Sequence, residues 1–99
     1  MEVILNAMIH EKTRFGIMIL LYTKKELSFK DIIEELDLTA GNLSSHIYKL
    51  EKEGYVEINK KFKDKKPLTL VKITSQGLKA MKEYMSNLKD ILKQAKIGG

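Results

Sequence analysis

The stretch Thr39–Tyr55, TAGNLSSHIYKLEKEGY, predicts a helix with two distinct faces, and the fold is built around it. Leu43, Ile47 and Leu50 recur at spacings of four and three, which places them in one apolar stripe. A second, polar face is expected to carry Asn42, Ser45, His46 and Lys49. Gly54 follows, and glycine is favoured just past the last turn of a helix. A helix of this kind can present side chains to a DNA groove, but amphipathic helices are common in globular proteins, so the neighbouring segments must decide.

The residues before this helix predict a second, shorter one. Residues 28–31 (SFKD) have the form of a capping box, in which a side chain satisfies a free backbone amide of the first turn. Ile32, Ile33 and Leu36 would form the buried face. Thr39 ends a connection of about three residues and can cap the following helix with its hydroxyl. Two short helices joined in this way predict a helix-turn-helix.

After residue 54 the apolar residues recur at a period close to two instead of about 3.6, which predicts a β-hairpin. Val56 and Ile58 alternate with polar residues in a strand that runs to about Phe62, and residues 69–73 alternate in a returning strand. Residues 63–67 would form the turn, which contains the only proline. A helix-turn-helix followed by a hairpin is a winged helix. We therefore predict a mainly helical α+β fold with a three-helix core, a two-stranded β-wing and a long C-terminal helix.

The two ends of the chain predict apolar contacts beyond this unit. Residues 1–9 form an apolar arm or short helix, and residues 10–23 form a helix that is apolar on nearly every side and belongs in the core. Thr74-Ser75 is expected to cap the last helix, which runs to about Ala95 and repeats apolar residues at spacings of three and four, like a coiled-coil seam. A seam of this length exceeds what a small core covers, so we expect it to pair with a second subunit; packing on the chain's own first helix is the alternative. The residues expected at a dimer interface are Ile4, Leu5, Met8, Leu78, Met81, Met85, Leu88 and Leu92.

Length and composition indicate one small globular domain, residues 1–99, with a winged-helix core at 10–73 and a dimerisation helix at 74–96. The formal net charge is +5, and residues 60–66 (KKFKDKK) hold five lysines and one aspartate, so about +4 of it lies there. Such a cluster suits a phosphate backbone or an anionic surface, although a merely solvated loop would look the same. The absence of cysteine excludes disulfides and thiolate metal sites. The longest apolar run, Phe15–Tyr22, is too short to span a membrane, and with no secretory signal we expect a cytoplasmic protein.

Residues 37–60, DLTAGNLSSHIYKLEKEGYVEINK, and residues 73–81, ITSQGLKAM, resemble the small winged-helix transcriptional regulators of the MarR/ArsR-like class. The resemblance covers roughly Arg14 to Met85. It implies a dimeric regulator that binds double-stranded DNA, with recognition helix 39–53 in the major groove and wing 60–67 on the adjacent minor groove or backbone. The contacts implied on the recognition helix and its cap are Thr39, Gly41, Asn42, Ser44, Ser45, His46 and Lys49. Those implied on the wing are Lys60, Lys61, Lys63, Lys65 and Lys66.

The chain departs from this class in two ways. Related wings often carry arginine near the tip, whereas Arg14 is the only arginine in this chain. Lysine is a strongly hydrated point charge and a poorer minor-groove probe, so we expect the wing to add affinity with little sequence preference. The metal-sensing branch uses cysteine clusters, and this chain has no cysteine.

The sequence lacks the motifs that an enzyme would need. The sequence has no glycine-rich phosphate loop and no metalloprotease motif, and adjacent Glu34 and Glu35 point in different directions on a helix, so we expect no enzyme, cofactor or metal site. A sequence-indifferent architectural DNA-binding protein and a winged-helix protein-interaction module stay open. A small-molecule effector could occupy the crevice between the first and last helices, but a chain this short leaves little room.

Overall fold

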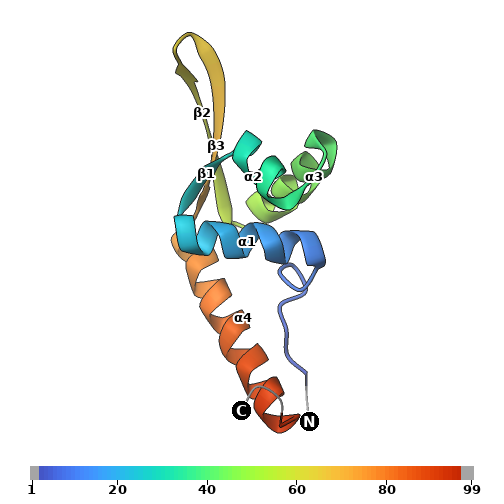
Figure 1. Ribbon diagram of the computed structural model, residues 1–99. Coiled ribbons are helices and arrows are strands. Elements are labelled where there is room, and N and C mark those ends of the chain that lie inside the picture. Colours follow the sequence, from blue (N-terminus) through green and yellow to red (C-terminus); the bar gives the residue numbers. More distant parts are fainter. Residues whose placement is uncertain (1–2, 97–99) are drawn as a thin grey trace.

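The computed structural model describes residues 3–96, which fold into a winged helix (Figure 1). The elements are α1 Lys12–Lys24, β1 Glu26–Ser28, α2 Phe29–Leu36, α3 Ala40–Lys52, β2 Val56–Lys63, β3 Lys66–Ile73 and α4 Ser75–Gln94. In Figure 1, α1 crosses the middle of the molecule, α2 and α3 lie beside it, and the β2–β3 wing and α4 project in opposite directions. The predicted fold class is confirmed.

Side-chain caps set where the helices begin. In three helices a hydroxyl accepts a hydrogen bond from the amide three residues on, over 3.0–3.1 Å; these caps are Ser28, Thr39 and Thr74. All three were predicted. The first helix begins at Lys12 instead of His10, because the Glu11 carboxylate accepts a hydrogen bond from the Arg14 amide over 2.8 Å and so caps the helix there.

The wing turn is shorter than predicted. Asp64 and Lys65 alone form it, both with positive φ (51° and 65°), which is the conformation of a two-residue type I′ hairpin. The expected turn over 63–67 is therefore wrong, and Pro67 lies within β3, opposite Phe62. In a two-residue hairpin the pair next to the turn exchanges hydrogen bonds, so Phe62 and Pro67 form a non-hydrogen-bonded pair. The missing amide hydrogen of proline then costs the ladder nothing.

The sheet has three strands in the order β1-β3-β2. The third strand, β1, is short, and its Leu27 pairs with Val71 of β3. Since β1 reaches no further along β3 than Leu70, the outer part of the hairpin remains a free two-stranded wing.

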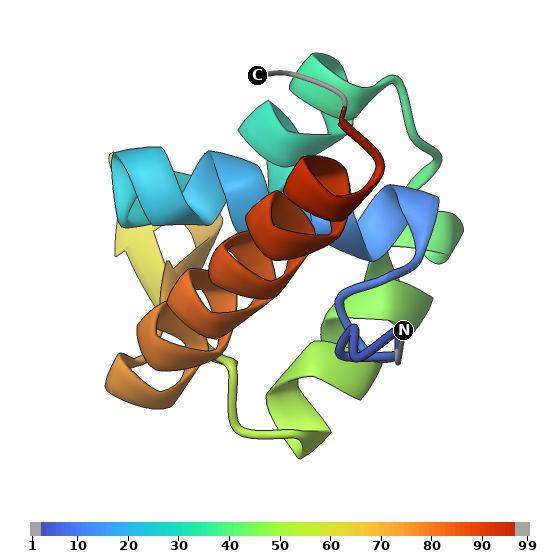
Figure 2. The same ribbon diagram turned by 90° about the horizontal axis from the view of Figure 1, so that it is seen from below.

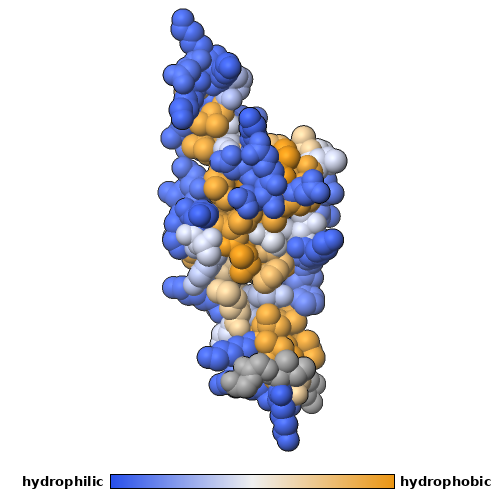
Figure 3. Space-filling model, in the orientation of Figure 1, coloured by the Kyte–Doolittle hydropathy of each residue, from blue (hydrophilic) through white to orange (hydrophobic). Residues whose placement is uncertain are grey.

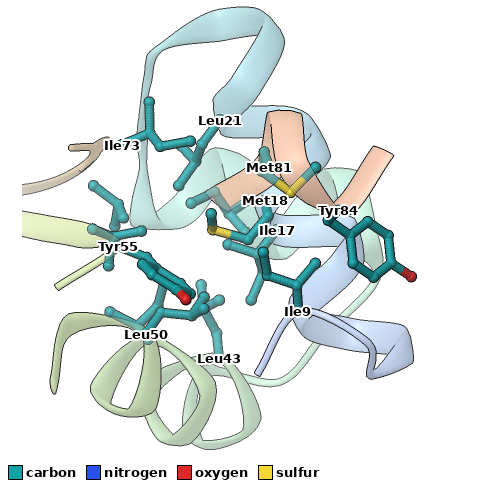
Figure 4. Packing of buried hydrophobic residues seen from close by; sticks show 14 residues of the cluster. Ile9, Ile17, Met18, Leu21, Leu43, Leu50, Tyr55, Ile73, Met81 and Tyr84 are labelled. Atoms are coloured by element: carbon teal, nitrogen blue, oxygen red, sulfur yellow. The ribbon is translucent and has the colours of Figure 1, made fainter. Parts of the chain in front are cut away.

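The core lies where α1, α3, α4 and the base of the sheet meet (Figure 4). The predicted stripe of α3 is buried in it, as are residues of α1 and α4. Fully or almost fully buried are Ile9, Ile17, Met18, Leu21, Ile32, Leu43, Ile47, Leu50, Val56, Val71, Ile73, Met81 and Tyr84. The carbonyl oxygen of Tyr55 occupies the space that a Cβ on Gly77 would need, so the start of α4 packs directly on the chain that follows α3.

The molecule is elongated, with extents of 53 × 25 × 21 Å. Its radius of gyration is 15.0 Å, against about 13 Å for a compact chain of this length. The wing forms one end, and the N-terminal arm, residues 3–11, lies with the C-terminal part of α4 at the other (Figure 1). Figure 2, seen from below, shows α4 crossing α1. Among residues 3–96, no helix is both long and apolar enough to cross a membrane.

Candidate nucleic-acid interface

The outer face of α3 is neutral and polar over its first half. Because Leu43, Ile47 and Leu50 anchor the helix in the core, the opposite side chains are exposed. The exposed predicted contacts are Thr39, Gly41, Asn42, Ser44, Ser45 and Lys49. The hydroxyl of Thr39 is already engaged in capping the helix.

His46 does not lie on this exposed face, which corrects the prediction. Its side chain is only 15% exposed. Position 46 follows Leu43 by three residues and precedes Leu50 by four, so it shares the side of the apolar stripe. The imidazole Nδ1 lies 3.2 Å from Nη1 of Arg14 and 3.7 Å from the Glu11 carboxylate. His46 is thus placed against the start of α1, away from solvent.

Arg14 joins the N-terminal arm to α3. Its Nε donates to the backbone carbonyl of Met8 over 2.7 Å while its Nη1 reaches His46. Burial opposes ionisation of Glu11, but hydrogen bonds from the backbone of Arg14 and Thr13, with the charges of His46 and Arg14, hold the pKa of this carboxyl below its ordinary value of 4.5. At the other end of α3, Asn6 in the arm donates from Nδ2 to the Tyr55 hydroxyl over 2.7 Å.

The wing carries uncompensated positive charge. Its five predicted contacts, Lys60, Lys61, Lys63, Lys65 and Lys66, are all exposed. Within the part of the chain that the structure describes, the only ion pairs join Glu11 to Arg14 and to His46, so no wing lysine is paired. Lys63 and Lys66 stand directly opposite each other, which is an unfavourable like-charge pair. An anionic partner would relieve that repulsion.

Helix α3 and the wing face each other across an open hollow of about 310 Å³. Ser44 and Tyr48 of α3 line one side, and Lys60 and Thr69 of the wing line the other. Of the predicted contacts, only Ser44 of α3 and Lys60 of the wing line this hollow, and Glu51 lines it too.

Tyr48 belongs to this surface and was missed by the sequence reasoning. Its side chain is 60% exposed, and the Lys52 Nζ lies 5.7 Å from the centre of its ring. The available signal was spacing: Tyr48 follows Ser44 by four residues and precedes Lys52 by four, so all three share one face. Tyrosine combines an apolar ring with a hydroxyl donor, which suits a DNA sugar-phosphate backbone.

Gly41 has no structural reason to be glycine. A Cβ at this position would meet nothing within 4 Å, and its φ is not positive. Glycine in a helix is less stable than alanine by up to about 1 kcal/mol. The open space in front of Gly41 is free for a molecule that must approach the helix backbone closely.

Only some of the residues predicted for a dimer interface are exposed. Met81 is fully buried in the core of its own chain, so that assignment is wrong. Leu5, Met8, Leu78, Met85 and Leu88 are half-buried against the same core. Ile4 at 60% and Leu92 at 38% are exposed, as is Val3 at 61%.

The crevice between α1 and α4 is largely filled by side chains. The Tyr84 hydroxyl lies 2.8 Å from the Nδ1 of His10, and the ring of Phe15 lies 5.5 Å from that of Tyr84, centre to centre. A hollow beside Tyr84 at the start of α1 measures about 170 Å³. Ligand pockets are usually at least about 300 Å³, so this hollow gives no support to a small-molecule effector.

Comparison with known proteins identifies the family. Residues 13–92 match the family described as winged helix DNA-binding domain. An uncharacterized protein of Methanocaldococcus jannaschii is 38% identical over 80 residues, covering 81% of this chain and 87% of that protein. The structure of a transcriptional regulator homologue from Pyrococcus horikoshii superposes with a TM-score of 0.86 and 38% identity, covering 91% of this chain and 89% of that one. The heme sensor protein PefR from Streptococcus agalactiae has a TM-score of 0.77, but its 21% identity, over 93% of this chain and 64% of that one, shows a shared fold only. The resemblance read from the helix-turn-helix and wing is confirmed, and the chain belongs to the winged helix DNA-binding domain family of transcriptional regulators.

Proposed function

We propose that the protein acts as a homodimer that places α3 of each protomer in successive major grooves of double-stranded DNA. The wing of each protomer then lies on the adjacent minor groove or backbone. The observation that carries this proposal is that Ser44 of α3 and Lys60 of the wing line one hollow, so that exposed hydrogen-bonding residues of the helix adjoin the unpaired lysine cluster.

The exposed residues of α3 divide into base contacts and backbone contacts. The Asn42 amide can pair with N6 and N7 of adenine, and Ser44 and Ser45 can bond base edges or phosphates. Lys49 and the wing lysines neutralise phosphates, which contributes affinity without sequence preference. His46 contributes by fixing α3 against Arg14 instead of by touching DNA.

The proposed dimer forms at the end of the molecule opposite the wing. Val3, Ile4 and Leu92 are exposed apolar residues there, and Figure 3 shows apolar surface at this end. A second copy that covers them would complete the seam of α4 with half-buried Met85 and Leu88. Paired helices of such a dimer are expected about 34–36 Å apart, one turn of DNA.

Selection of bound sequences from a random DNA pool tests this function. A palindromic consensus is the expected result, with two half-sites separated by about one helical turn. Asn42→Ala or Ser45→Ala should flatten the preference at one or two positions of each half-site, whereas Ser86→Ala on the exposed surface of α4 should leave the consensus unchanged.

The two alternatives predict different outcomes. Tight binding without any enriched sequence would favour an architectural DNA-binding protein. No binding to any DNA would favour a protein-interaction module. If Asn42→Ala lowers the affinity for every sequence equally, base recognition by α3 is wrong.

A further inference from the structure

Phe62 is a large apolar side chain exposed in the middle of the lysine cluster. It is 78% exposed, and Lys60, Lys61 and Lys63 are its neighbours along β2. Figure 3 shows an apolar patch on the wing within otherwise hydrophilic surface. Single exposed apolar residues are common on proteins, so the exposure of Phe62 does not by itself indicate a function. Its position on the wing is the informative observation.

Phe62 lies on the side of the wing that faces α3. Alternate residues of a strand share one face, so Ile58, Lys60 and Phe62 lie in one row. Their partners across the hairpin are Val71, Thr69 and Pro67. The row begins in the core, continues through Lys60 and Thr69, which line the hollow beside α3, and ends at the Phe62–Pro67 pair. The apolar pair is thus an extension, towards the wing tip, of the surface that we propose faces DNA.

The chemistry of this tip matches the minor groove. The walls of the minor groove are phosphate backbones, which lysines contact. The floor of the groove presents sugars and base edges, which an apolar side chain can touch. Proteins that insert apolar residues between base steps partly unstack them, and flexible pyrimidine–purine steps yield most easily. Residues 60–66 supply both parts, five lysines and one exposed phenylalanine.

We propose that Phe62, backed by Pro67, enters the minor groove as an apolar probe while the surrounding lysines hold the two phosphate strands. This inference rests on the proposed function and deepens it. It also replaces the expectation, drawn from the absence of arginine, that the wing is indifferent to sequence. Phe62 gives the wing a preference for a deformable step beside each half-site.

The chain contains no tryptophan, so Phe62→Trp introduces a single fluorescent reporter at the site. On titration with the selected duplex, the emission of this variant should be strongly quenched, because the indole contacts bases. Gln94→Trp, at an exposed position near the C-terminal end of α4, is the matched control and should keep its emission. Unchanged emission of Phe62→Trp at saturating DNA would overturn the inference.

Phe62→Ala provides a second, independent readout. The affinity should fall roughly tenfold, while the dependence of the affinity on salt stays the same because no charge is lost. In a random-pool selection, Phe62→Ala should lose the preference for a pyrimidine–purine step outside the half-site and retain the rest of the consensus. Retention of both affinity and flanking preference would overturn the inference and leave the proposed function intact. Failure of the wild-type protein to bind DNA would overturn both.

Discussion

Arg14 donates a hydrogen bond from Nη1 to Nδ1 of His46 over 3.2 Å, and this contact ties the first helix to the recognition helix. The same guanidinium holds the Met8 carbonyl in the N-terminal arm. Arg14 therefore joins the arm to α3, together with the Glu11–His46 and Asn6–Tyr55 contacts.

Replacing Arg14 with lysine should destabilise the fold by about 1–3 kcal/mol, because a point ammonium cannot reproduce the two directed contacts of the guanidinium. Urea denaturation of Arg14→Lys measures the change, and Lys12→Ala, an exposed residue of the same helix, is the control. In a double-mutant cycle with His46→Ala, the double variant should lose less unfolding free energy than the sum of the losses in the two single variants. Fully additive effects would show that the two side chains do not act together.

The lowered pKa of Glu11 predicts how the stability of the fold responds to acid. Its pKa is lowered in the folded protein, so its contribution to stability is present above the unfolded pKa, near 4.5, and is lost as the pH falls through the lower folded value. Glu11→Gln should therefore be less stable than wild type at neutral pH. The difference in unfolding free energy should shrink as the pH falls below 4.5. Chemical denaturation between pH 7 and 3 tests this, and a difference independent of pH would contradict it.

Gly41→Ala should separate stability from function. Since nothing lies within 4 Å of the added Cβ, the variant should gain up to about 1 kcal/mol in unfolding free energy. Its affinity for the selected DNA should nevertheless fall, on the order of tenfold, because the methyl group fills the space for close approach. Gly16→Ala is the contrasting control: its Cβ would meet Leu36 at 3.3 Å, and DNA affinity should not change. If Gly41→Ala binds DNA as well as wild type does, DNA does not approach α3 at this point.

Leu92→Asp should dissociate the proposed dimer, because a charge in an apolar interface is strongly unfavourable. Sedimentation equilibrium should give a mass near 11.4 kDa for the variant and twice that for wild type. The affinity of Leu92→Asp for a palindromic DNA site should fall as the dimer dissociates. Ser86→Asp adds the same charge at another exposed position of α4 and should remain dimeric. A wild-type protein that is monomeric at micromolar concentration would contradict the dimer.

Features set by local chemistry were predictable from the sequence. The caps at Ser28, Thr39 and Thr74 depend on hydrogen bonds within one turn of helix, and the stripe of α3 depends on its own spacing. The exposed face of α3 followed for the same reason, except at His46. The helical spacing of His46 from Leu43 and Leu50 already indicated the buried side, although the polarity of histidine suggested the exposed one.

Features set by distant contacts were not predictable. Pro67 and the lysine run resemble a loop, yet pairing with β2 extends the strand to Lys66. The approach of the Tyr55 carbonyl to Gly77 and the burial of Met81 depend on how α4 crosses the core. Apolar periodicity indicates that a face is buried but not whether the same chain or a second copy covers it. Phe62 was missed because a single exposed aromatic residue carries no periodic signal of its own, whereas the spacing of Tyr48 from Ser44 and Lys52 was a usable signal.

The wing lysines should contribute affinity that is equal for all DNA sequences. The variant in which Lys63, Lys65 and Lys66 are replaced by alanine should bind every duplex more weakly. Each lysine that contacts a phosphate should reduce the magnitude of the salt slope by about one. Exchange of Lys89 and Lys93 of α4 for alanine lowers the net charge elsewhere and serves as the control. An equal loss of slope in the control would mean that net charge, not the wing, drives binding.

The salt dependence of the affinity of the wild-type protein for duplex DNA tests the central claim most directly. If a dimer neutralises about eight phosphates, the logarithm of the association constant should fall against the logarithm of the salt concentration with a slope of about −7. A slope near zero would contradict DNA binding through the lysine wing and the recognition helix.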